Sequence, residues 1–151
     1  VTSEVTLRDV VVYQDRRRFA DKRALLVVTG RVTAGIALDS SRADGGGAEV
    51  RIDHATRRIA VSLPPAELTS VEVTDVRTYD ERAGLLNPWR PEDRDALQRE
   101  VRARLARAGE ESGLRERANR SAVALLERLL ARDGYTVEVS VRGPAVVPRA
   151  G

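Results

Sequence analysis

Alternating apolar and polar residues predict several β-strands in the first half of the chain. Val5–Tyr13 alternates loosely and is rich in branched residues, which is typical of a strand. From Ala24 to Leu38 the even-numbered residues are small or apolar, which predicts one long, half-buried strand. Val50–Ile52 and Ile59–Leu63 alternate in the same way, and Leu68–Val76 resumes an extended pattern. The pattern therefore predicts a protein built first from strands.

After Pro91 the spacing of apolar residues becomes helical. Proline is favoured in the first turn of a helix, and the acidic residues that follow it suit the positive end of the helix dipole. Gly109 and Gly113 predict a break around Glu110–Ser112, after which helical spacing resumes at Leu114. Gly134 is expected to cap the second helical piece, and Tyr135–Val141 predicts a last strand. We expect one face of the sheet to be covered by the apolar helical stripe, namely Leu97, Val101, Leu105, Leu125 and Leu129.

These elements predict an α+β fold. We expect a mostly antiparallel, twisted sheet of about six strands, packed against a long, broken C-terminal helical segment and followed by a last strand. Residues 1–143 are predicted to form a single domain, and residues 144–151 a frayed C-terminal tail.

Composition narrows the possible chemistry. The 151 residues include no Cys, which excludes disulfides, thiolate nucleophiles and Cys-based metal sites. The only histidine, His54, lies in a predicted turn, so no His-rich metal site is expected and we assign no metal and no cofactor. The net charge of +3 is spread along Arg90–Arg132, where 11 Arg are interleaved with 8 acidic residues. Because nucleic-acid sites gather cations and stacking aromatics, this distribution argues against nucleic-acid binding.

The segment from Tyr79 to Trp89 combines turn-forming residues with the only neighbouring acids in an irregular stretch. Asp80 and Glu81 are candidates for acid–base chemistry, although solvated turn acids would give the same pattern. Trp89 is amphipathic and could anchor a partner or cover the core beside the helix start. The candidate ligand or partner surface therefore comprises Tyr79, Asp80, Glu81, Asn87 and Trp89.

A second candidate is the basic run Arg16, Arg17 and Arg18, which interrupts the first strand. A charged run between two strands is typical of a solvated hairpin tip. The alternative is contact with an anion or with lipid headgroups.

The order of these segments resembles a bacterial family of unknown function, DUF4230. The resemblance rests on Leu25–Leu38, on Val61–Leu68, on Tyr79–Glu81 with Gly84–Pro88, and on Glu111–Leu130 leading to Gly134 and Tyr135. It spans nearly the whole chain. It implies a small α+β domain behind an N-terminal membrane anchor, with no assigned activity and no catalytic residues to transfer. Arg90, before Pro91, departs from the capping Ser or Thr that the family pattern implies.

Together these observations predict a binding module rather than an enzyme. We expect a membrane-tethered, extracytoplasmic domain that binds a protein or an envelope component, its anchor lying outside this sequence, which begins at Val1. An enzyme or small-ligand site around Tyr79 to Trp89 is the alternative, and anionic-lipid or nucleic-acid binding through the Arg-rich segments is the third. Self-association through the apolar helix stripes is also open.

Overall fold

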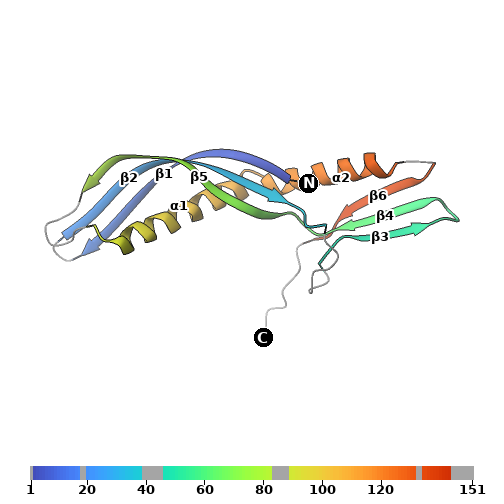
Figure 1. Cartoon of the computed structure of the whole chain (residues 1–151), viewed down its shortest axis with the longest axis horizontal. Helices are drawn as coiled ribbons and strands as arrows, with labels where there is room; N and C mark the ends of the chain where they lie inside the picture. The colour runs from blue at the N-terminus through green and yellow to red at the C-terminus, as the bar shows by residue number, and fades with distance from the viewer. Residues whose placement is uncertain (1, 18–19, 39–45, 83–88, 132–133, 144–151) are drawn as a thin grey trace, which may run out of the picture. The chain divides into compact units, whose positions relative to one another are not determined.

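The computed structural model describes residues 2–17, 20–38, 46–82, 89–131 and 134–143. It confirms the predicted α+β class. The described residues form six strands and a helical segment in two pieces, and the sixth strand follows the helices (Figure 1). In chain order the elements are β1 (Thr2–Arg17), β2 (Ala20–Gly35), β3 (Glu49–Asp53), β4 (Arg58–Leu63), β5 (Glu67–Arg82), α1 (Pro91–Glu111), α2 (Leu114–Leu130) and β6 (Thr136–Val141).

The strands are divided between two three-stranded sheets, in the orders β1-β2-β5 and β3-β4-β6. The chain accordingly separates into two compact units. The long-sheet unit comprises Glu4–Thr33 and Leu68–Leu114, and the short-sheet unit comprises Val1–Ser3, Ala34–Glu67 and Arg115–Gly151. Each unit contains one sheet and most of one helix.

In the long-sheet unit, β2 is the central strand. The Thr69 hydroxyl donates to the Thr33 carbonyl at 3.2 Å and the Thr74 hydroxyl to the Thr29 carbonyl at 3.1 Å, so β2 and β5 run antiparallel. As the alternation predicts, one face of β2 is buried, and its buried residues are Lys22, Ala24, Leu26, Val28, Val32 and Ala34. On the opposite face Arg31 forms ion pairs with Glu4 of β1 and Glu72 of β5.

Helix α1 packs closely on the buried face of this sheet because two glycines remove side chains from the contact. A Cβ at Gly30 would overlap Leu105 and would lie 3.0 Å from the Glu72 carbonyl oxygen. A Cβ at Gly109 would lie 2.8 Å from the Val32 side chain. Val101 and Leu105 are buried here, which confirms this part of the predicted stripe, and Leu97 is half-buried.

The short-sheet unit is centred on β4. Strands β3 and β4, both predicted from their alternation, pair antiparallel with Val50 opposite Val61, whereas β6 pairs with β4 in parallel and places Val139 beside Val61. Val61 and Leu63 are buried, and the Asn119 side-chain oxygen of α2 accepts the backbone N–H of Ala66 at 2.9 Å. Because β6 runs parallel to β4, the last strand departs from the mostly antiparallel sheet that the sequence predicts.

The buried stripe of α2 differs from the expected one. Leu125 and Leu129 were predicted to cover a sheet, but they are 39% and 51% exposed. The buried positions are Leu114, Ala118 and Ala122, and the row continues at steps of four through half-buried Leu126 and Leu130. In a helix of 3.6 residues per turn, residues four apart are displaced by about 40° around the axis. The buried row from Leu114 to Leu130 therefore winds around α2 and leaves Leu125 and Leu129 outside it.

Three strands differ in extent from the prediction. Strand β2 spans Ala20–Gly35 instead of Ala24–Leu38, and β1 and β5 are longer than predicted. Strand β1 continues through Arg16 and Arg17, which were expected in a hairpin tip, and β5 continues through Tyr79, Asp80 and Glu81, which were expected in an irregular segment. Charged residues are compatible with a strand where one face meets solvent. The predicted helix break is confirmed, because α1 ends at Glu111, α2 begins at Leu114 and Gly113 between them has φ of 72°. Among the described residues, neither helix has the length and apolar character required to cross a bilayer.

The close contact at Gly30 predicts a specific sensitivity to added volume. Gly30→Ala should lower the free energy of unfolding by about 1–3 kcal/mol, because the new methyl group forces Leu105 away from β2. Urea denaturation followed by circular dichroism measures this loss. Gly143→Ala is the matched control, since a Cβ there has no atom within 4 Å. Equal stability of the two variants would contradict the packing.

Candidate functional site

The predicted site residues fall at the end of β5 and just before α1. Tyr79 is 65% exposed on β5. Glu81 is exposed on the same strand, and Trp89 is half-buried ahead of α1. Asn87 and the Asp80 side chain lie outside the described residues. The structure therefore brings Glu81 and Trp89 together at one pocket and leaves Tyr79 outside its wall.

This pocket, of about 410 Å³, lies in the long-sheet unit between α1 and the sheet. Its floor and walls are mostly aliphatic, and polar side chains stand around them. The lining residues are Ala24 and Leu26 of β2; Val73, Val76, Thr78 and Glu81 of β5; Trp89; and Arg94, Leu97, Gln98, Val101 and Arg102 of α1. We call this the α1 pocket.

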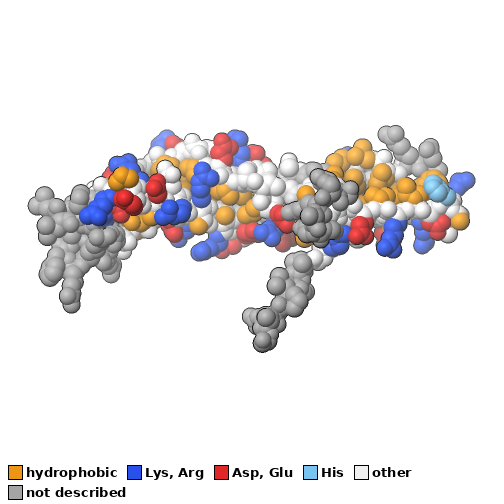
Figure 2. Space-filling view, turned by 60° about the horizontal axis from the view of Figure 1, so that its bottom comes forward, with side chains coloured by type: hydrophobic (Ala, Val, Ile, Leu, Met, Phe, Trp, Pro, Cys, Tyr) orange, Lys and Arg blue, Asp and Glu red, His pale blue; other side chains and the backbone are white. Residues whose placement is uncertain are grey.

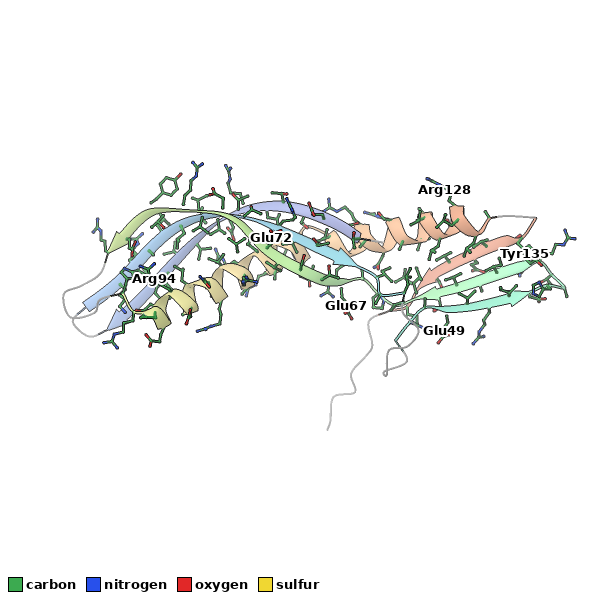
Figure 3. The ribbon with its side chains drawn as sticks, viewed as in Figure 1. Glu49, Glu67, Glu72, Arg94, Arg128 and Tyr135 are labelled. Atoms are coloured by element: carbon green, nitrogen blue, oxygen red, sulfur yellow. The ribbon has the colours of Figure 1, made fainter. Side chains whose placement is uncertain are left out.

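Helix α1 supplies one complete wall because its lining residues recur every three or four positions. Arg94 and Arg102 stand eight residues apart on this wall, about 12 Å along the axis, with Leu97 and Val101 between them. Figure 3 shows Arg94 near the start of the helix. Arg102 donates to the Val71 carbonyl at 3.5 Å, whereas the guanidinium of Arg94 has no hydrogen bond or ion pair within the described residues.

Trp89 lines the pocket and carries a buried hydrogen-bond donor. Its indole Nε1 is buried and has no acceptor among the described residues. The ring contacts Tyr13 of β1, with centroids 5.6 Å apart and planes tilted by 36°. A buried N–H without an acceptor costs about 1–3 kcal/mol. Because Nε1 is buried, a molecule in the pocket would contact the indole ring and not this N–H.

Beside the pocket lies a buried ion pair. Lys22, the only lysine in the sequence, is 1% exposed, and its Nζ contacts Oδ2 of Asp93 in the first turn of α1. Asp93 also accepts the Arg90 backbone N–H at 2.8 Å, and the Tyr13 hydroxyl lies 3.4 Å from its other oxygen. The hydrogen bond from Lys22 and the one from the Arg90 amide lower the pKa of Asp93 below its ordinary value.

The pair explains how α1 begins without a Ser or Thr cap. The Asp93 carboxylate bonds back to the Arg90 amide, which is half of a capping box, and it is held there by Lys22. Lys22 was not predicted from the sequence. It lies before the predicted strand Ala24–Leu38, and its partner Asp93 is 71 residues away in the chain.

The polar groups that line the α1 pocket can form hydrogen bonds and ion pairs with a bound molecule. Among the described residues no three His, Cys, Asp or Glu side chains come close enough to hold a metal ion. His54 lies in the short-sheet unit, where its Nδ1 is 2.8 Å from the Tyr135 hydroxyl in an exposed pair. Glu81 is the one carboxylate that lines the α1 pocket among the described residues. General acid–base catalysis would need a second positioned group.

The basic candidate is only partly described. Arg16 and Arg17 belong to β1, but their side chains and the whole of Arg18 lie outside the described residues. The proposed anion or lipid contact at these three residues therefore stays a prediction.

The Lys22–Asp93 pair predicts how stability responds to acid. The pKa of Asp93 is lowered in the folded state, so its contribution is complete above its unfolded pKa of about 4 and is lost as pH falls through the folded value. Denaturant titrations between neutral and acidic pH should show Asp93→Asn weakening the fall in stability below pH 4. Part of the fall should remain, because hydrogen bonds from Thr56 also lower the pKa of Asp53.

Asp95→Asn, an exposed change on the same helix turn, is the control and should keep the acid response of the unmodified protein. An Asp93→Asn variant with an unchanged acid response would show that the carboxylate is not held by Lys22 in the folded state.

Comparison with known proteins adds the family and nothing more specific. No curated protein and no solved structure matches the chain. A family model described as "Protein of unknown function (DUF4230)" matches residues 1–141 of the 151. The match agrees with the resemblance found in the strands, in the Tyr79–Glu81 segment and in the broken helix. The chain belongs to the DUF4230 family.

Proposed function

We propose that this protein is a non-enzymatic binding module whose α1 pocket takes an amphiphilic small molecule with an acidic head group. The single observation that carries the proposal is the guanidinium of Arg94, which lines the α1 pocket and has no hydrogen bond or ion pair within the described residues. A donor in this position is suited to an acceptor on a ligand. The proposal takes up the small-ligand alternative at Tyr79 to Trp89 and sets its catalytic part aside.

The size and lining of the α1 pocket support a ligand with an apolar body. A volume of about 410 Å³ falls within the usual range for small-molecule sites, which are mostly apolar with a few placed polar groups. Leu26, Val73 and Leu97 offer the apolar contact. An alkyl chain buried against them would gain roughly 25 cal/mol for each Å² removed from water.

The charges at the pocket support an acidic head group. Arg94 has no ion pair within the described residues, and its planar guanidinium can hold a carboxylate through two parallel hydrogen bonds. Arg94 lies in the first turn of α1, and Trp89 lies two residues before the helix begins; both line the pocket. The carboxylate of Glu81 on β5 would repel an anionic head group placed near it. The head group is therefore expected beside Arg94 and away from Glu81.

The proposal also keeps the cellular setting that the resemblance implies. The domain is tethered to the cell membrane by an N-terminal anchor outside this sequence and faces the extracytoplasmic side. Its larger partner is a protein or an envelope component. This setting rests on what the resemblance to the family implies.

Isothermal titration calorimetry with decanoic acid and decanol tests the ligand class. Decanoic acid should bind saturably, and Arg94→Gln should weaken it at least about tenfold while leaving decanol unchanged, because only the acid uses the guanidinium.

Arg128→Gln, at an exposed position of α2, is the matched control and should leave both affinities unchanged (Figure 3). Absence of saturable binding of either compound, or equal losses in Arg94→Gln and Arg128→Gln, would overturn the proposed ligand.

Cell fractionation tests the setting. The natural full-length protein should sediment with membranes, and protease added outside spheroplasts should degrade this domain while leaving cytoplasmic markers intact. Recovery of the full-length protein only in the cytosolic fraction would refute the tether, and protection from external protease would refute the extracytoplasmic orientation.

A further inference from the structure

Strand β3 is an exposed sheet edge in the short-sheet unit. It pairs with β4 on one side, and on the other side no strand neighbours it within the described residues. Such an edge presents backbone donors and acceptors that can pair with another strand. All five residues of β3 are exposed, and Val50 and Ile52 are exposed by 57% and 53%. Figure 2 shows hydrophobic side chains gathered on this unit close to His54.

The two faces of β3 have different characters. Glu49 and Arg51 border a polar hollow together with Ser62, Glu138 and Ser140, so their side chains share one face of the sheet. Val50 and Ile52 alternate with them and therefore occupy the other face. An added strand would thus have to match charges on one face and apolar side chains on the other.

A second copy of β3 meets these requirements in a particular register. In an antiparallel pair centred on Ile52, each Arg51 faces Asp53 of the other copy and the two Ile52 side chains meet. In a pair centred on Arg51, Glu49 would face Asp53 and Arg51 would face Arg51, which repels. A pair centred on Val50 would set Arg51 against Glu49, whose carboxylate is already bound by Arg142 at 3.5 Å.

The groups that would pair across the Ile52 register are available. Arg51 has no ion pair or hydrogen bond from its side chain within the described part of the chain. The Asp53 carboxylate accepts the backbone N–H groups of Ala55 and Thr56 on Oδ1, at 3.0 and 3.2 Å, and a hydrogen bond from the Thr56 side chain. A carboxylate has about four acceptor sites, so it can take a further donor. Both charged residues can therefore form the new pair without breaking one that the structure shows.

We propose that two copies of this chain associate through β3, forming a continuous six-stranded sheet in the order β6-β4-β3-β3-β4-β6. The strands run antiparallel about a twofold axis at Ile52, and Arg51 of each copy forms an ion pair with Asp53 of the other. Val50 and Ile52 of both copies form one apolar strip on a single face of the joined sheet. The association is independent of the α1 pocket, which lies in the other unit.

Analytical ultracentrifugation up to about 1 mM protein tests the association. The unmodified chain should show a reversible monomer–dimer equilibrium. Arg51→Asp should weaken the dimer at least about tenfold, because it turns two attractive cross-strand pairs into repulsive ones. Mixing the Arg51→Asp chain with an Asp53→Arg chain should restore association as a heterodimer, since every cross-strand pair is then of opposite charge.

The matched control replaces Asp53→Arg by Glu49→Arg in the same mixture. The Glu49→Arg chain should dimerise with itself, because its Arg51 and Asp53 are intact, but a fluorescently labelled Arg51→Asp chain should stay monomeric in its presence. Circular dichroism of each variant checks that the hairpin still folds, because Asp53 also binds the turn amides. A monomer at all concentrations, an Arg51→Asp chain that dimerises normally, or rescue by Glu49→Arg instead of Asp53→Arg would each overturn the proposal.

Discussion

The ion pair between Lys22 and Asp93 is the constraint on which the long-sheet unit depends. A lysine buried in the face of β2 must have a charged partner, since an unpaired charge in that position would cost several kcal/mol. Asp93 can be that partner only if α1 begins where it does, with its first turn over β2. The same carboxylate bonds the Arg90 amide and lies near Tyr13, on which Trp89 packs. This one buried contact therefore fixes both the residue at which α1 begins and the position of the Trp89 ring.

The α1 pocket follows from how α1 is held at its two ends. Near its C-terminal end, Gly30 and Gly109 let α1 approach β2 closely. Near its start, the long Lys22 side chain and the Trp89 ring occupy the space between helix and sheet. The chain contains one Phe and no Met, so few side chains are large or flexible enough to fill the region between these ends. The aliphatic wall that remains is the surface to which we assign a ligand.

Much of the fold could be predicted from periodicity, because the patterns of strand and helix differ in repeat. The even positions of β2 and the break at Gly113 were found because local sequence determines them. The division into two sheets could not be found, since pairing partners such as Val61 and Val139 are distant in the sequence. Leu125 and Leu129 were misassigned because two helical rows, offset by one residue, are both apolar and only tertiary contacts choose between them.

Part of the candidate site was likewise accessible from sequence. Glu81 and Trp89 were identified as unusual, and they do border the α1 pocket, but the strand that carries Glu81 was taken for a turn because charged residues dominate it. Lys22 acts through Asp93, which is 71 positions away in the sequence, and Arg94 belongs to a pocket built from three elements. No local sequence pattern indicates either role.

The most direct test of the central claim is a nuclear Overhauser measurement between protonated decanoic acid and the methyl groups of an otherwise deuterated protein. The account predicts contacts from the alkyl chain to Leu26, Val73 and Leu97 in the α1 pocket. Contacts confined to exposed valines such as Val10 and Val12, or to Val50 and Ile52, would contradict it and leave the α1 pocket without a role in binding.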